Sequence, residues 1–256
     1  MKIEQLAIQL YTLREHCQNA ADYATTLKKV RQIGYESIQI SGTGDIPVAD
    51  LRSIAESEGL TICATHESAD LIRESPSQVV ERLGALGCRY TAYPYPAGVD
   101  FSRRSDIDTL IADLDAAGAV LRQAGQVLCY HNHAHELYRL DGTTVLDLIY
   151  DGTAAENLQG ELDTYWVQAG GSCPVAWCEK LANRLPLLHL KDFAVTPEGK
   201  PFFAEIGSGN LDFPKIISAA EKSGCEWFIV EQDTCPGDPF DSIAKSFHYA
   251  KEHLVS

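Results

Sequence analysis

The sequence has no long apolar run and little positive charge. No stretch approaches the roughly 20 apolar residues that a membrane-spanning helix needs. Residues 1–6 lack the apolar core of a signal peptide, and the formal net charge of the 256-residue chain is −15. This excess of acidic residues disfavours binding to nucleic-acid phosphates or to anionic membranes. We therefore expect a cytoplasmic protein that binds neither nucleic acid nor membrane.

Two sequence motifs are also missing. None of the eight cysteines is spaced as CxxC, so neither a zinc ribbon nor a thioredoxin-type redox site is indicated. In a long chain without a secretion signal, we expect most cysteines to be buried and reduced. No GxGxxG motif follows the first predicted strand, which argues against an open dinucleotide-binding sheet.

What the sequence does contain is a repeated unit, in which a short apolar run precedes a helical pattern. The apolar runs predict strands at residues 6–11, 37–40, 61–65, 89–93, 127–131, 158–162, 187–190 and 226–230. The helical patterns cover residues 21–33, 48–57, 76–87, 106–124, 145–150, 174–185, 213–223 and 240–253. Eight such units, spaced by about thirty residues, are what a (β/α)8 barrel requires. We predict that residues 1–256 form one α/β domain of this TIM-barrel type.

Four of the predicted strands lead into side chains that bind metals: His131, Asp163, His189 and Glu231. The carboxyl ends of parallel barrel strands meet at one rim, and neighbouring strands lie about 4.8 Å apart. Imidazole and carboxylate donors favour Mn²⁺, with Mg²⁺, Co²⁺ and Zn²⁺ as alternatives. We therefore predict one divalent ion at this rim. Taken singly, each histidine can instead be structural, and Asp163 can cap the next turn.

The segment after the fifth strand offers more than one candidate, because His131, His133, His135 and Glu136 crowd together there. Strand alternation places His131 and His133 on one face. We assign His131 to the ion and His133, one step further out, to proton transfer. Glu136 can bind the ion or hydrogen-bond a substrate, and His135 and Glu136 can equally be solvated loop residues.

Three side chains that end or follow the third, fourth and sixth predicted strands are assigned to substrate contact: His66, Tyr93 and Trp166. The aromatic Tyr95 lies in the same loop as Tyr93. Aromatic rings at a barrel rim can cover the flat C–H faces of a sugar, but they can also simply pack.

Lys191 follows the seventh predicted strand and is assigned to catalysis, since it can neutralise an anionic oxygen. The alternative is an ion pair with its neighbour Asp192, which would have little energetic value. The glycines of residues 207–209 can bring backbone N–H groups to a phosphate or a hydroxyl group.

Several motifs resemble those of the sugar phosphate isomerase/epimerase family, a group of xylose isomerase-like TIM barrels. The family includes inosose dehydratases, ketose 3-epimerases and, more distantly, endonuclease IV. The motifs are QLYTLR at 9–14, YHNH at 130–133, DTYW at 163–166, HLKD at 189–192, GSG at 207–209 and VEQD at 230–233.

The resemblance implies an ion held by a strand-five carboxylate together with Asp163, His189 and Glu231. This chain departs at the first position, where the epimerases carry glutamate and the sequence has His131. In those enzymes the strand-five and strand-eight glutamates exchange protons with opposite faces of the substrate. The departure therefore argues against simple ketose 3-epimerisation. It does not change the expectation of a bound metal ion.

These features predict a metal-dependent isomerase or epimerase of a small sugar, sugar phosphate or cyclitol. Glu231 or His133 would remove a proton next to a carbonyl group, giving an enediolate that the ion stabilises. A dehydratase or lyase of a keto-inositol or 3-keto-glycoside is the alternative, because the same intermediate can expel a β-substituent. A damaged-DNA endonuclease, which the acidity disfavours, and a non-catalytic sugar-binding barrel are further classes. The sequence leaves the oligomeric state open, with a homodimer as one alternative, because barrels of this kind often pair.

Overall fold

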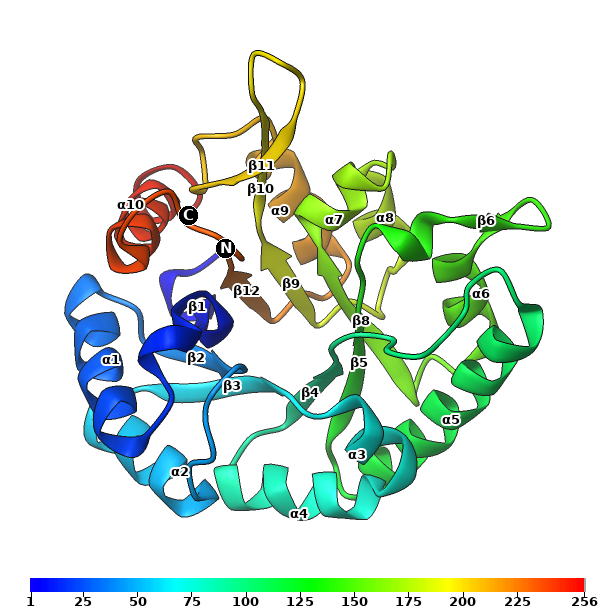
Figure 1. Cartoon of the computed structure of the whole chain (residues 1–256), viewed down its shortest axis with the longest axis horizontal. Helices are drawn as coiled ribbons and strands as arrows, with labels where there is room; N and C mark the ends of the chain where they lie inside the picture. Colours follow the sequence, from blue (N-terminus) through cyan, green and yellow to red (C-terminus); the bar gives the residue numbers. More distant parts are fainter. Residues whose placement is uncertain (256) are drawn as a thin grey trace.

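Eight short strands close into a parallel barrel in the computed structural model, which describes residues 1–255 (Figure 1). The strands are β1 (Leu6–Gln9), β2 (Ser37–Ile40), β3 (Thr61–His66), β4 (Tyr90–Tyr93), β5 (Val127–His131), β8 (Leu158–Asp163), β9 (Leu187–Leu190) and β12 (Trp227–Val230). Each strand pairs with the next in chain order, and β12 closes the ring by pairing in parallel with β1. The predicted (β/α)8 fold is confirmed.

Helices surround the barrel and cover the outer faces of the strands (Figure 1). The longer ones are α1 (Ala20–Ile33), α2 (Val48–Ser57), α4 (Pro76–Leu86), α5 (Arg104–Gln123), α6 (Val145–Gly152), α8 (Pro174–Lys180), α9 (Phe213–Lys222) and α10 (Pro239–His253). Shorter elements lie in the loops: α3 (Ala69–Glu74), α7 (Thr164–Ala169), the hairpin of β6 (Arg139–Leu140) and β7 (Thr143–Thr144), and the hairpin of β10 (Asp192–Val195) and β11 (Pro201–Ala204).

Two predicted elements end earlier than the sequence pattern suggested. The first strand stops at Gln9, whose side-chain oxygen accepts a hydrogen bond from the backbone N–H of Tyr11, and the chain continues as a 3-10 segment, Leu10–His16. The helix that starts at Pro174 stops at Lys180. It cannot reach residue 185 because Asn183 adopts a left-handed backbone with φ of 61°.

The barrel interior has an apolar level and a polar level. The apolar level is formed by a buried cluster of Ala7, Cys63, Ala64, Tyr90, Ala92, Cys129, Leu187 and Ile229. Side chains two positions apart on a strand point the same way. The residues that follow Ala7, Cys129, Leu187 and Ile229 by two positions are Gln9, His131, His189 and Glu231. These four strands, β1, β5, β9 and β12, therefore each contribute an apolar side chain below and a polar one toward the mouth.

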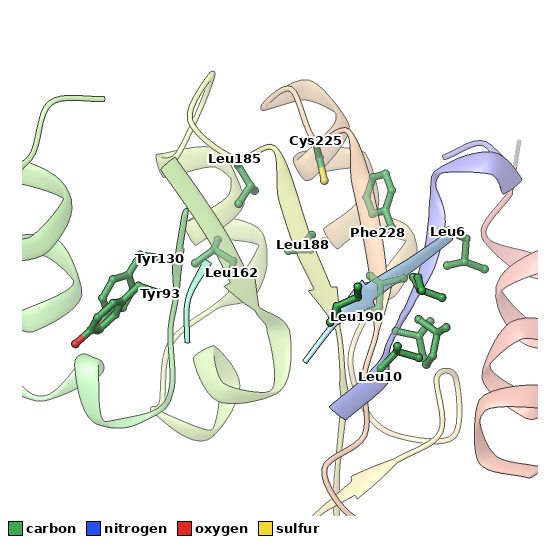
Figure 2. Packing of buried hydrophobic residues seen from close by; sticks show 14 of the residues in the cluster. Leu6, Leu10, Tyr93, Tyr130, Leu162, Leu185, Leu188, Leu190, Cys225 and Phe228 are labelled. Atoms are coloured by element: carbon green, nitrogen blue, oxygen red, sulfur yellow. The ribbon is translucent and has the colours of Figure 1, made fainter. Parts of the chain in front are cut away.

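The larger part of the core lies between the strands and the helices. Leu162, Leu188 and Phe228 are almost completely buried there, on β8, β9 and β12 respectively (Figure 2). Six of the eight cysteines are buried and all are free thiols, which agrees with the packing role expected from the sequence. Among residues 1–255, no helix combines the length and apolar character needed to cross a bilayer.

Candidate active site

Four adjacent strands bring the proposed metal ligands together at the mouth of the barrel. His131 closes β5, Asp163 closes β8, His189 lies in β9 and Glu231 follows β12. One ligand atom from each of these side chains lies within 4.8 Å of the other three. All four residues are buried. The geometry thus offers two imidazoles and two carboxylates to one small volume.

Asp163 shows how well this donor set fits a cation. Its Oδ1 accepts a hydrogen bond from the backbone N–H of Trp166 at 2.9 Å and so caps α7. Its Oδ2 is buried, has no hydrogen-bond partner among residues 1–255, and lies 4.0 Å from both His131 Nε2 and His189 Nδ1. The capping alternative raised by the sequence is therefore correct, yet it leaves one oxygen for another purpose. A buried carboxylate oxygen that accepts no hydrogen bond and faces two imidazoles suits a divalent ion.

The two histidines differ in their electrostatic surroundings. Burial lowers the pKa of His131 to about 4, so its ring is neutral near pH 7, the form that binds metals. Burial alone would also lower the pKa of His189, but the carboxylates of Glu161 and Glu231 raise it to about 9. His189 Nδ1 lies 2.9 Å from Glu231 Oε2. A cation bound between these residues would displace the proton that they now share.

Lys191 adds a fixed positive charge beside the same carboxylates. Its side chain is buried, and its Nζ lies 2.9 Å from Glu231 Oε2, 3.3 Å from Asp163 Oδ2 and 2.6 Å from Asp233 Oδ1. Burial alone would lower the pKa of Lys191, but these three carboxylates raise it above its usual value. In turn, Lys191 and His189 hold the pKa of Glu231 well below its usual range, against the opposing effect of burial.

The alternative pairing of Lys191 with Asp192 is wrong, and so is the anion-binding role of the glycine loop. Asp192 Oδ2 accepts hydrogen bonds from the backbone N–H groups of Gly207 and Gly209, both at 2.9 Å. A carboxylate of the chain itself thus occupies the donors that could have met a phosphate. The glycines are needed for close approach, since a Cβ on Gly209 would lie 2.4 Å from Asp192 Oδ1.

Glu136 does not face the ligand cluster. It is fully buried, its Oε1 accepts a hydrogen bond from Tyr130 OH at 3.0 Å, and its Oε2 accepts one from the backbone N–H of His133 at 2.8 Å. The catalytic role assigned from the sequence is therefore corrected: Glu136 fixes the loop that carries His133. Burial raises the pKa of Glu136 to about 7.

The aromatic candidates also separate in the structure. Tyr93 is completely buried and stacks on Tyr130 with ring centroids 5.8 Å apart (Figure 2), so its assignment to substrate contact is corrected to a core role. Trp166 packs beside Lys191, Phe203 and His133 and is not among the residues that line the cavity described below. Tyr95, in the loop after β4, lies at the cavity and packs edge-on against His133.

A cavity of about 420 Å³ opens above the ligand cluster, a size typical of small-molecule sites. His66, His133, Lys191 and Glu231 all line it, as the sequence analysis expected of rim residues. Its wall consists of Tyr11, Arg14, Ser41, His66, Pro94, Tyr95, His131, His133, Lys191, Glu231, Asp233 and Thr234. The sequence analysis quoted the motifs that contain Arg14 and Asp233 but gave these two residues no role.

The sequence analysis also missed a polar network directly below the cluster. Glu161 is fully buried in β8, and its Oε1 lies 2.5 Å from His66 Nε2 and 3.2 Å from His131 Nδ1. Its Oε2 accepts a hydrogen bond from Gln39 Nε2 at 2.6 Å. Glu161 precedes Asp163 by two positions, so strand alternation could have placed both carboxylates inside the barrel.

This fold and this mouth, with imidazoles and carboxylates on adjacent strand ends, define a TIM barrel with a candidate metal site. The chain belongs to the xylose isomerase-like TIM barrel family, whose model matches residues 27–253.

Relatives of known type include the inosose dehydratase of Clostridium beijerinckii, which is 29% identical over 161 residues, 56% of this chain and 53% of the relative. An inosose dehydratase of Clostridium perfringens is 24% identical over a segment of the same length, again 56% of this chain and 54% of that protein. The matched segment thus spans about half the length of these relatives.

Among solved structures, a sugar phosphate isomerase/epimerase of Parabacteroides distasonis superposes with a TM-score of 0.83 at 22% identity, over 97% of this chain and 93% of that one. An L-ribulose 3-epimerase gives a TM-score of 0.74 at 16% identity, over 99% and 95% of the two chains. At such identities the similarity shows the fold alone.

Proposed function

We propose that this protein is a divalent-metal-dependent isomerase or epimerase that removes a proton next to a carbonyl group of a sugar, sugar phosphate or cyclitol. His131, Asp163, His189 and Glu231 would hold the ion, for which Mn²⁺ is the first candidate. A bound ion supplies positive charge beside the substrate oxygens, where negative charge develops during proton removal. The observation that carries the proposal is the buried Glu231 carboxylate in the cavity floor, fixed by two neighbours.

Glu231 is the group that takes the proton. Within residues 1–255, the side-chain hydrogen bonds of Glu231 all go to Oε2, from His189 and Lys191. Its Oε1 is therefore the oxygen left for a substrate proton. Because two neighbours fix the carboxylate, it needs little reorganisation when a substrate enters. Lys191, 2.9 Å away, keeps a positive charge next to the reacting atoms.

His133 is the second proton-transfer group. It lines the cavity from the loop after β5, and its buried Nδ1 has no hydrogen-bond partner in the described part of the chain, residues 1–255. Glu136 holds the backbone N–H of His133, and Tyr95 packs against the ring, so the imidazole is positioned from two sides. His133 would donate its own ring proton to the neighbouring carbon in an isomerisation, or to the opposite face in an epimerisation, while Glu231 keeps the proton taken from the substrate.

A dehydratase or lyase is the second candidate, and His131 favours it. The strand-five position of the ketose epimerases carries a proton-transferring glutamate, whereas this chain has an imidazole there. The similarity to inosose dehydratases points the same way. In that reaction Glu231 would take the α-proton, a carbon–carbon double bond would form as the β-carbon–oxygen bond breaks, and His133 would protonate the leaving oxygen.

Proton exchange and elimination can be measured together. The metal-loaded protein is incubated in deuterated water with ketoses, keto-inositols and 3-keto-glycosides and followed by NMR. Deuterium uptake at the α-carbon without elimination supports the isomerase or epimerase, and elimination supports the dehydratase or lyase. The His189→Ala variant should stay folded, lose the ion and lose both signals. Absence of both signals with every substrate, in protein that holds one ion per chain, contradicts both candidates.

A further inference from the structure

The network below the ligand cluster contains one carboxylate that contacts both ligand histidines. Glu161 Oε1 lies 3.2 Å from His131 Nδ1 and 3.3 Å from His189 Nε2. Each of these is the ring nitrogen on the side away from Asp163, since Asp163 Oδ2 faces His131 Nε2 and His189 Nδ1. Glu161 therefore lies on the inner side of the cluster, opposite the cavity.

Hydrogen-bond polarity through Gln39 fixes the orientation of His189. An ionised carboxylate only accepts hydrogen bonds, so the Gln39 atom 2.6 Å from Glu161 Oε2 must be its amide nitrogen. The amide oxygen of Gln39 is then the atom 2.7 Å from His189 Nε2. An amide oxygen also only accepts, so His189 Nε2 must carry a proton. His189 Nδ1 is left as the nitrogen directed at Asp163 and Glu231.

The same argument applies to the other two rings. Gln9 Nε2 donates to Gln39 Oε1 at 3.0 Å and lies 3.4 Å from His66 Nδ1, which makes His66 Nδ1 the acceptor and His66 Nε2 the protonated nitrogen facing Glu161. Among residues 1–255, His131 Nδ1 makes no hydrogen bond, but Glu161 Oε1 lies 3.2 Å away as a carboxylate oxygen that can only accept a hydrogen bond. A proton on Nδ1 leaves His131 Nε2 free to face Asp163.

We propose that Glu161, acting directly on His131 and through Gln39 on His189, is a positioning residue that sets which ring nitrogen of each histidine faces the ion. The inference rests on the ion site of the proposed function. Carboxylates and carbonyls in this position orient histidine ligands and raise their basicity, and losing one typically weakens metal binding 10- to 100-fold. Glu161 itself stays off the ion.

Metal affinity and ring tautomers test this separately from catalysis. Zn²⁺ and Mn²⁺ affinities are measured by competition with a chelator for the wild type, Glu161→Gln and Gln39→Met. Long-range ¹H–¹⁵N NMR of the imidazoles in the Zn²⁺-loaded protein reports which nitrogen carries the proton. Glu161→Gln should keep one ion per chain, bind it about 10- to 100-fold more weakly and shift the proton of His131 or His189. Gln39→Met should change the position of the ring proton on His189 more than on His131. If Glu161→Gln fails to fold, Gln39→Met alone tests the proposal.

Unchanged affinity and unchanged tautomers in both variants would overturn the proposal. Complete loss of the ion from folded Glu161→Gln would also overturn it, because Glu161 would then be a ligand, in a set with His66, His131 and His189. Failure of the wild-type protein to bind any divalent ion would instead count against the proposed function. Ser41→Ala, at the cavity wall outside the network, is the control and should keep wild-type affinity.

Discussion

Lys191 Nζ and His189 Nδ1 lie at the same distance, 2.9 Å, from one oxygen of Glu231. A permanent ammonium and a potential metal ligand thus share a single carboxylate oxygen at the floor of the cavity. The arrangement favours the ionised form of Glu231 and, within residues 1–255, leaves its other oxygen without a side-chain hydrogen bond. It also means that Lys191 and a bound cation compete for the same negative charge.

Replacing Lys191 by methionine should separate ion binding from catalysis. The variant should bind a divalent ion at least as tightly as the wild type, because a competing positive charge is gone, while α-proton exchange falls about 100-fold or more. The ion-free variant should lose thermal stability, since Asp163 and Glu231 lose a buried counter-ion, and regain it when the ion is added. Chelator competition, NMR exchange and thermal melting measure the three effects.

The control for Lys191→Met is Lys215→Met, at an exposed ion pair, which should behave as wild type. Weaker ion binding by Lys191→Met would contradict the assignment.

Replacing His133 by alanine should leave the ion bound but slow α-proton exchange with deuterated water by about 100-fold. The reason is that His133 lines the cavity without belonging to the ligand set. The matched control is His135→Ala, since His135 stacks on His133 with centroids 5.4 Å apart but is itself outside the cavity wall. Equal exchange rates in the two variants would show His133 to be a bystander.

Titration of Glu136 should lower the free energy of unfolding of the protein as the pH rises. Burial raises its pKa to about 7 from an ordinary value of 4.5, so between these pH values the folded state holds a proton that the unfolded state has lost. Its contribution is fully present below pH 4.5 and lost as pH rises through 7. Glu136→Gln mimics the protonated form at every pH. On going from pH 4.5 to pH 8, its free energy of unfolding should therefore rise by about 3 kcal/mol relative to that of the wild type. Urea unfolding at both pH values measures this, and exposed Glu198→Gln should show no such difference.

Two glycines in helices should respond oppositely to alanine. A Cβ on Gly118, in α5, would lie 1.9 Å from the backbone oxygen of Asn157, so Gly118→Ala forces α5 away and should destabilise by about 1–3 kcal/mol. A Cβ on exposed Gly84, in α4, meets nothing within 4 Å, and Gly84→Ala should stabilise by about 0.5–1 kcal/mol through helix propensity. Thermal or urea unfolding measures both. A neutral Gly118→Ala would show that the two segments are less closely packed.

The positions of His131, Asp163, His189 and Glu231 at strand ends followed from local sequence. Each comes after a short apolar run, and the parallel barrel then forces these ends to one rim. The alternation of side chains also accounts for Glu161 and Asp163 sharing the interior of β8. Contacts between residues far apart in sequence, such as Gln39 and Glu161, could not be predicted from local patterns. Their contact depends on barrel closure, since 122 positions separate them.

The sequence by itself determined the fold and which strand ends carry His131, Asp163, His189 and Glu231, because both depend on periodicity within single units of the chain. Only the tertiary structure decided what each polar group meets: Asp192 binds backbone N–H groups rather than Lys191, Tyr93 belongs to the core, and Glu136 holds a loop. Hydrogen bonds and ion pairs act over about 3 Å. Whether two groups fall within that distance is set by how separate units pack, which no single stretch of sequence contains.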